Sequence, residues 1–84
     1  MNEIKDVSKL VSAYPNPITD ILNIDAKGVV AESYSLYDLK GQLVAADVIV
    51  ENKTQLSTGN LQTGVYVLKV KTAAGIVVKR IIKK

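Results

Sequence analysis

The sequence predicts an all-β fold, an immunoglobulin-like antiparallel β-sandwich of about seven strands. Short segments alternate apolar and polar residues with a period of two, as at Leu22, Ile24 and Ala26, which is typical of half-buried strands. Turn-forming residues recur roughly every 8–12 residues, as they do in sandwiches. No amphipathic window with a helical period exceeds two turns. A small barrel is the alternative architecture.

The expected strands are short and follow one another along the whole chain. They cover residues 10–14, 20–26, 31–38, 42–46, 47–51, 54–57, 65–72 and 75–82. Segment 44–50 is either one bent strand or two, so the count is seven or eight. For residues 3–10 the alternatives are a weak helical turn and a frayed leader, and we expect the leader.

Glycine, proline and aspartate mark the turns between these strands. Tyr14-Pro15-Asn16-Pro17 predicts a rigid entry, because each proline fixes φ and restricts the residue before it. Asp38 and Gly41 predict a turn that Asp opens and in which Gly supplies a positive φ. Gly64 predicts a tight turn before the next strand, and Ala73-Ala74-Gly75 predicts a hairpin.

The same alternation assigns three of the tyrosines to a face of the sheet. Tyr34 and Tyr66 fall on the apolar face and should be buried, whereas Tyr37 falls on the opposite face and should be exposed. One exposed tyrosine does not form the stacking platform that binders of single-stranded nucleic acid use.

The composition excludes most catalytic chemistry. The 84 residues form one domain. There is no His and no Cys, which excludes Ser-His-Asp and Cys-His nucleophiles and imidazole or thiolate metal sites. The five glycines are dispersed among turns and form no phosphate-binding loop. We therefore expect a protein that is not an enzyme and that has no cofactor.

Carboxylates are the remaining source of chemistry. Asp20 and Asp25 are the candidates for a catalytic pair, and with Asp38 and Asp47 they are the candidate oxygen ligands for calcium. We expect no metal site, because the loop spacing of an EF-hand is absent and acidic residues at strand ends usually cap turns or face solvent. No segment has the length and apolar character of a signal peptide or a transmembrane helix.

The net charge of +3 is unevenly placed, because Lys79, Arg80, Lys83 and Lys84 lie within residues 79–84. A basic end can contact nucleic acid or a protein partner. Lysines also protect an edge strand against aggregation. We expect a solvated edge strand before a protein-recognition role, and no nucleic-acid partner.

Four segments in this order resemble the motifs of the type A C-terminal sorting domain of the bacterial type IX (Por) secretion system. They are Tyr14-Pro15-Asn16-Pro17 followed by residues 20–24, residues 36–38 with 41–44, residues 61–66, and residues 78–84. Each segment alone is a weak signal, but their order, their spacing and the position of the last one are specific.

The resemblance implies a C-terminal secretion and sorting signal. In that family the domain directs an attached cargo from the periplasm across the outer membrane of a Gram-negative cell, to the cell surface or the extracellular space. The implied partners are the secretion machinery, an outer-membrane sortase that removes the domain, and the cargo. Residues 1–10 are then expected to be a leader or linker from the upstream cargo, and residues 11–84 the sorting domain. The alternative function is a non-catalytic adhesive or carbohydrate-binding module, against which the scarcity of aromatic residues counts.

The resemblance also marks the residues that we expect to carry recognition. They are Tyr14, Pro15, Asn16, Pro17, Asp38, Gly41, Gly64, Tyr66, Lys79, Arg80, Ile81, Ile82, Lys83 and Lys84. For the last segment we expect an accessible end and an exposed edge strand that pairs with a partner's sheet.

Overall fold

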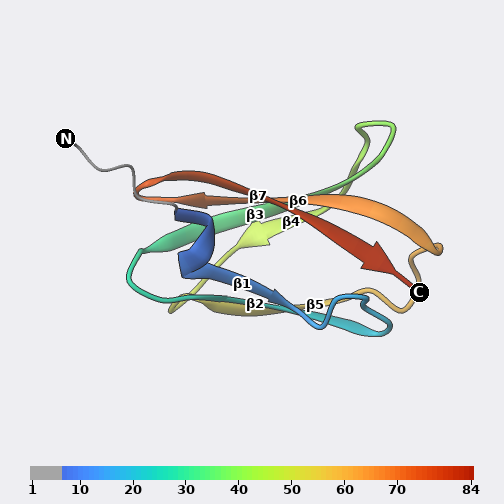
Figure 1. Cartoon of the computed structure of the whole chain (residues 1–84), viewed down its shortest axis with the longest axis horizontal. Coiled ribbons are helices and arrows are strands. Elements are labelled where there is room, and N and C mark those ends of the chain that lie inside the picture. The colour runs from blue at the N-terminus through green and yellow to red at the C-terminus, as the bar shows by residue number, and fades with distance from the viewer. Residues whose placement is uncertain (1–6) are drawn as a thin grey trace.

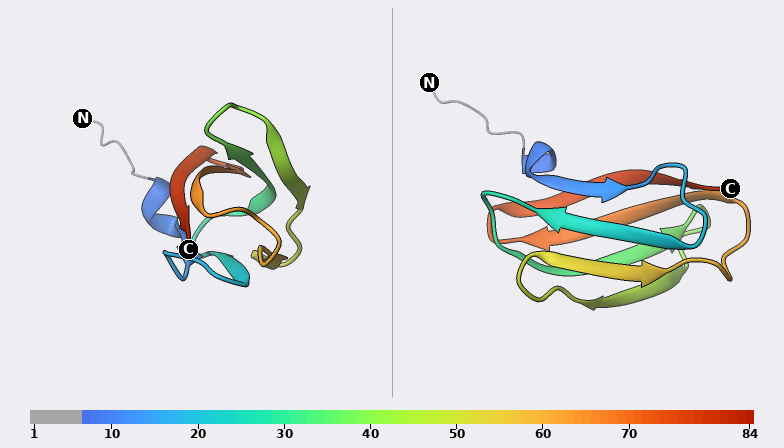
Figure 2. Two further views of the ribbon diagram at one scale, coloured as in Figure 1. Left: turned by 90° about the vertical axis from the view of Figure 1, so that its right-hand side faces the viewer. Right: turned by 90° about the horizontal axis from the view of Figure 1, so that it is seen from below.

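Two antiparallel β-sheets pack face to face in the computed structural model of the chain, as the two layers in Figures 1 and 2 show. The structure describes residues 7–84. One sheet has the strand order β1-β2-β5, and the other has the order β4-β3-β6-β7. The elements are η1 (Val7–Leu10), β1 (Val11–Tyr14), β2 (Ile21–Ala26), β3 (Ala31–Asp38), β4 (Leu43–Val48), β5 (Lys53–Ser57), β6 (Gly64–Thr72) and β7 (Gly75–Lys83). The predicted antiparallel sandwich of seven strands is confirmed.

The core lies between the two sheets, and strand alternation decides which side chains fill it. Leu22 and Ile24 of β2 are buried against the larger sheet, whose central strands contribute Leu36 and Leu68. The rest of the buried apolar set comprises Val11, Ile18, Ala26, Ala31, Tyr34, Ile49, Tyr66, Val70, Val77 and Ile81. The burial predicted for Tyr34 and Tyr66 is confirmed, and burial, with a smaller contribution from Asp47, raises the pKa of Tyr34. Among residues 7–84, no helix has the length and apolar character needed to cross a membrane.

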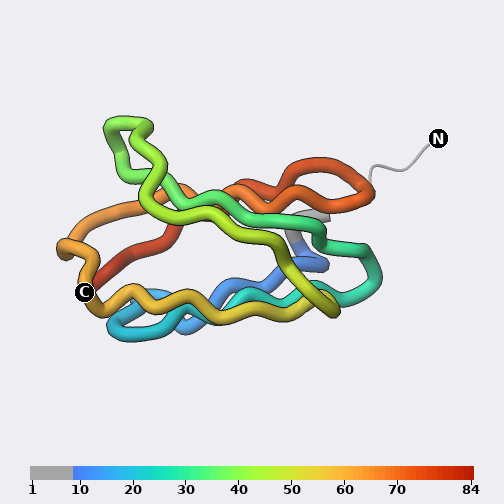
Figure 3. Tube along the Cα trace, turned by 180° about the vertical axis from the view of Figure 1, so that it is seen from behind, coloured from blue at the N-terminus to red at the C-terminus, as the bar shows by residue number. Residues whose placement is uncertain are grey.

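The chain changes sheets between β4 and β5, as the tube in Figure 3 shows. The prediction of a separate strand over residues 47–51 is wrong, because β4 is a single strand that ends at Val48. Glu51 and Asn52 have positive φ angles of 57° and 62°. The Lys53 N–H donates to the Val50 carbonyl at 3.4 Å. The Ile49 N–H still donates to the Glu32 carbonyl of β3 at 2.9 Å, and the reversal at Glu51 and Asn52 then takes the backbone out of the β4-β3-β6-β7 sheet.

Asn52 ties this reversal to the loop between β2 and β3. Its Oδ1 accepts a hydrogen bond from the Ala31 N–H at 3.0 Å, and its Nδ2 donates to the Val29 carbonyl at 2.8 Å. Its own carbonyl accepts from the Ala26 N–H at 2.9 Å. The Asn52 side chain thus provides hydrogen-bond partners for backbone groups that lie outside the regular pairing of the strands. The sequence pattern did not reveal this role.

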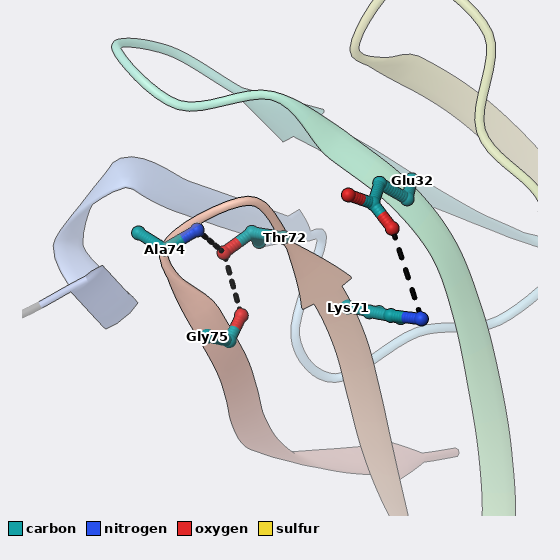
Figure 4. Close-up of polar contacts among 5 residues, drawn as sticks. All are labelled: Glu32, Lys71, Thr72, Ala74 and Gly75. Atoms are coloured by element: carbon teal, nitrogen blue, oxygen red, sulfur yellow. Dashed lines mark hydrogen bonds and ion pairs between the residues drawn. The ribbon is translucent and has the colours of Figure 1, made fainter.

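The last two strands form a hairpin at residues 73–75, as predicted. The Thr72 hydroxyl donates to the Gly75 carbonyl and accepts from the Ala74 N–H, which closes the turn from within (Figure 4). Gly75 has a φ of 127°, a conformation that favours glycine.

The segment before β1 differs from the frayed leader that we expected. Val7–Leu10 forms a short 3₁₀ helix, η1, that lies against β1 and β7. The Leu10 carbonyl accepts a hydrogen bond from the Lys27 N–H at 2.8 Å, which extends the β1–β2 ladder by one step. The helical turn is therefore the correct alternative for these residues, and residues 3–6 lie outside the described part of the chain.

Tyr66 closes the loop that leads into β6. Its hydroxyl donates to the Gln62 carbonyl at 2.7 Å, four residues upstream, in the manner of the tyrosine corner of immunoglobulin-like sandwiches. The prediction of a tight turn at Gly64 is wrong: Gly64 begins β6, and the turn lies earlier, where the Leu61 N–H donates to the Thr58 carbonyl at 3.0 Å.

The Tyr66 hydroxyl should therefore contribute to stability beyond the packing of its ring. Tyr66→Phe keeps the ring but removes the bond to Gln62, and we expect a loss of about 1 kcal/mol in the free energy of unfolding. A fall in melting temperature of about 4–8 °C, measured by circular dichroism, would follow. Tyr14→Phe is the matched control, because the Tyr14 ring is 48% exposed. Equal melting temperatures for the two variants would contradict this role.

Candidate functional site

The sheet register brings three of the four sequence motifs into one row. Asp38 of β3 pairs with Tyr66 of β6, and Tyr66 pairs with Ile81 of β7. The fourth motif joins them through Asn16, whose side chain contacts the backbone of β7. Figure 1 shows this end of the sandwich on the right, where the last residue also lies. Segments that are far apart in sequence therefore form one site at one end of the molecule.

The residues of β7 divide into two faces. The inward set lies between the sheets, with Val77, Ile81 and Lys83 buried and Lys79 half-buried. The outward set is exposed to solvent and comprises Ile76, Val78, Arg80 and Ile82. Period-two alternation places Lys79 and Lys83 on the same face as Val77 and Ile81, although their charge alone suggests solvated side chains.

Asn16 occupies the edge of β7 in place of a neighbouring strand. Its Nδ2 donates to the Arg80 carbonyl at 3.2 Å, and its Oδ1 accepts from the Ile82 N–H at 2.9 Å. A side-chain amide carries a carbonyl acceptor and an NH₂ group with two donors, in nearly the geometry of a peptide group. Asn16 can therefore satisfy two groups that an edge strand otherwise presents to solvent.

Ile18 continues this contact toward the end of β7. Its N–H donates to the Ile82 carbonyl at 2.7 Å, and its carbonyl accepts from the Lys84 N–H at 2.9 Å, which makes a short parallel bridge. The Ile18 side chain is fully buried. The expectation that β7 has a free edge is therefore wrong over its second half, because the chain's own residues 16–18 already pair with it.

The prolines of this segment hold the chain in the path that it needs. Pro15 and Pro17 flank Asn16, and both peptide bonds that precede them are cis. Neither proline has an N–H to satisfy, and each fixes its own φ. Tyr14 and both prolines are exposed, so the fold uses them for the backbone path and leaves their outer surfaces open.

Lys83 differs from the solvated lysine that the sequence suggested. Its side chain is only 7% exposed, and its Nζ donates to the Lys84 carbonyl at 3.2 Å. Lysine can bury its aliphatic stem while its ammonium group stays near the boundary of the protein. Lys84 itself is exposed, so the two terminal lysines have different surroundings.

Asp38 and Gly41 form the turn between β3 and β4, as predicted. Asp38 Oδ1 accepts from the Lys40 N–H at 2.9 Å and from the Gln42 N–H at 3.0 Å. Gly41 has a φ of 85°, in the left-handed region where glycine is favoured. Both residues thus have a role in the fold, and the Asp38 carboxylate is already engaged with the backbone.

The acidic residues considered at the sequence level lie on separate elements. Asp20 lies in the loop before β2, Asp25 near the other end of β2, Asp38 at the end of β3, and Asp47 in β4. In the part of the chain that the structure describes, no group of three or more His, Cys, Asp or Glu side chains gathers in a metal-binding arrangement.

A basic hollow of about 670 Å³ lies between β1 and β7, bounded by Asn16 at one end. Lys9 of η1 and the inward-facing Lys79 of β7 line it, and Arg80, whose side chain belongs to the outward set, also borders it. No acidic residue is among the described residues that line it. The half-buried position of Lys79 therefore places a positive charge between the sheet edges.

The pairing of Asn16 with β7 can be tested at single amides. Asn16→Ala removes both hydrogen bonds, and we expect the Ile82 amide to exchange with solvent about ten-fold faster, the effect of losing ~1.4 kcal/mol of local stability. Native-state hydrogen exchange by NMR measures this rate. Asn60→Ala, in an exposed loop, is the control. Unchanged protection of Ile82 in Asn16→Ala would show that the side chain does not hold the strand.

Comparison with known proteins agrees with the grouping of the motifs. The family described as the secretion system C-terminal sorting domain matches residues 12–84, which include all four motifs. Beta-agarase D of Zobellia galactanivorans is 33% identical over 70 residues. That alignment covers 83% of this chain but only 14% of the length of the agarase. The chain, with these four motifs gathered at one end of a seven-stranded sandwich, belongs to the family of secretion system C-terminal sorting domains.

Proposed function

We propose that this domain is a secretion and sorting label that directs an attached cargo protein across the outer membrane to the cell surface or the extracellular space. The observation that carries the proposal is the match of residues 12–84 to the sorting-domain family. Cargo, in this proposal, precedes residue 11 and passes through the periplasm before the secretion machinery recognises the label. An outer-membrane sortase then removes the domain.

The geometry supports a label whose last strand is held in a fixed conformation. Residues 16 and 18 pair with β7, and Ile81 of that strand is buried in the core. A short peptide of the same sequence would have to pay the conformational entropy of ordering when a partner bound it. In the folded domain that ordering has already taken place.

The agarase comparison supports a cargo that is much larger than the label. The matched region is 14% of that protein, so the rest of its length lies outside the sorting domain. We propose the same division for the protein to which this chain belongs: the label has no catalytic role, and any catalytic activity resides in the cargo.

Export of a reporter tests this function. We expect a periplasm-targeted fluorescent protein fused ahead of residues 1–84 to reach the surface or the medium of a host with a type IX secretion system. In an otherwise identical host that lacks the system, the reporter should stay in the periplasm. Cell fractionation and protease accessibility measure both. Retention in both hosts would contradict the proposal.

Removal of residues 79–84 should also leave the reporter in the periplasm. This deletion takes away the buried Ile81 and Lys83, so it disrupts both the fold and the signal. Circular dichroism of the purified truncation shows how much of the fold is lost. Normal surface delivery of the truncated fusion would contradict the proposal, whether the truncated domain keeps its fold or loses it.

A further inference from the structure

In the second half of β7, only the side chains on the outward face remain accessible to a partner. Val77, Ile81 and Lys83 point into the sandwich. The edge from Arg80 to Lys84 is paired with residues 16–18. Side chains that point away from the core are therefore the part of the terminal motif that a partner can contact without unfolding the domain.

The outward residues of β7 continue onto β6 as one surface, which we call the outer face. In the antiparallel register, Val65 lies beside Ile82, Val67 beside Arg80, Lys69 beside Val78, and Lys71 beside Ile76. Cross-strand neighbours of this kind lie about 4.5–5.5 Å apart at their Cβ atoms. Val67 is in turn beside Tyr37 of β3, and Tyr37 is beside Leu43 of β4.

The outer face is unusually apolar for solvent-exposed sheet. Ile76, Val78 and Ile82 are 67%, 57% and 43% exposed, and Leu43 is 58% exposed. Val65, Val67 and Tyr37 are half-buried. A contiguous apolar surface is typical of an interaction site, whereas single exposed apolar residues are not.

The charges on the outer face are mainly positive. Lys69, Lys71 and Arg80 project from it, and the Lys69 Nζ lies 5.2 Å from the centre of the Tyr37 ring, within reach of a cation–π interaction. Glu32 lies 3.9 Å from the Lys71 Nζ (Figure 4), but both side chains are well exposed, at 47% and 66%. Such a pair contributes little and leaves Lys71 available to a partner.

The positive charges of the outer face indicate which kind of partner can bind there. Two copies of the chain joined by their outer faces would bring Lys69, Lys71 and Arg80 against like charges, which costs affinity. A carboxylate-rich surface with an apolar centre would complement both the charges and the apolar residues. We propose that the outer face of β6 and β7 is the surface by which the secretion machinery recognises this domain, through a protein partner that presents Asp and Glu side chains around an apolar patch.

This inference rests on the proposed sorting function. The same export assay tests the recognition surface and the sorting function separately. The test variant is Val78→Thr with Arg80→Glu and Ile82→Thr, which changes only outward side chains and keeps β-branched residues in the strand. The control is Ile21→Thr with Val50→Thr and Lys53→Glu, at exposed positions elsewhere on the sandwich. Each variant replaces one Val and one Ile by Thr and one basic residue, Arg80 or Lys53, by Glu, so both change the net charge equally.

We expect the outer-face variant to lower export of the fused reporter about ten-fold or more, as loss of an interface hot spot would. The control should export like the wild type, and both purified domains should keep the circular dichroism spectrum of the wild type. If wild type and outer-face variant are exported equally, or if both variants fail equally, the inference is wrong while the sorting function stands. Failure of the wild type itself counts against the sorting function.

Photo-crosslinking identifies the occupant directly. Val78→p-benzoylphenylalanine places the probe on the outer face, and the same substitution at Val50 is the control. We expect position 78 alone to crosslink to a protein of the secretion host, at peptides rich in Asp and Glu when mapped by mass spectrometry. Crosslinks to lipopolysaccharide, to a second copy of the chain, or equally from position 50 would overturn the proposal.

Discussion

The two hydrogen bonds of the Asn16 side chain to β7 connect the beginning of the domain to its end. They replace a missing neighbouring strand at Arg80 and Ile82, and the backbone of Ile18 completes the contact at Lys84. Because β7 is an edge strand of its sheet, β6 is the only strand of that sheet with which it forms a ladder. The position of the last residues therefore depends on a segment that lies more than sixty residues earlier.

This constraint gives a physical reason for the grouping of the four motifs. Asp38 shapes the turn after β3, Tyr66 closes the loop into β6, and Asn16 pairs with β7. Each motif fixes the backbone at the same end of the sandwich. Most of the motif residues thus have roles in the fold, and the recognition that we propose falls to the side chains that point away from the core.

The sequence was sufficient to predict the features that depend on local pattern. Period-two alternation located the strands and the buried Tyr34 and Tyr66, and turn chemistry located Asp38 and Gly41. Alternation could not separate β4 from the reversal after it, because the positive φ angles at Glu51 and Asn52 follow from the crossing between sheets. Two roles depend on non-local contacts and were missed for that reason: the pairing of Asn16 with β7, and the burial of Lys83.

The central claim is that the fold presents β7 to the secretion machinery in the conformation that Asn16 secures. The most direct test is export of a reporter fused to the Asn16→Ala domain, at a temperature where circular dichroism shows the sandwich to be folded. The claim predicts export well below that of the wild type, with Asn60→Ala exported normally. Wild-type export by a folded Asn16→Ala domain, in which Ile82 has lost its hydrogen-exchange protection, would contradict it.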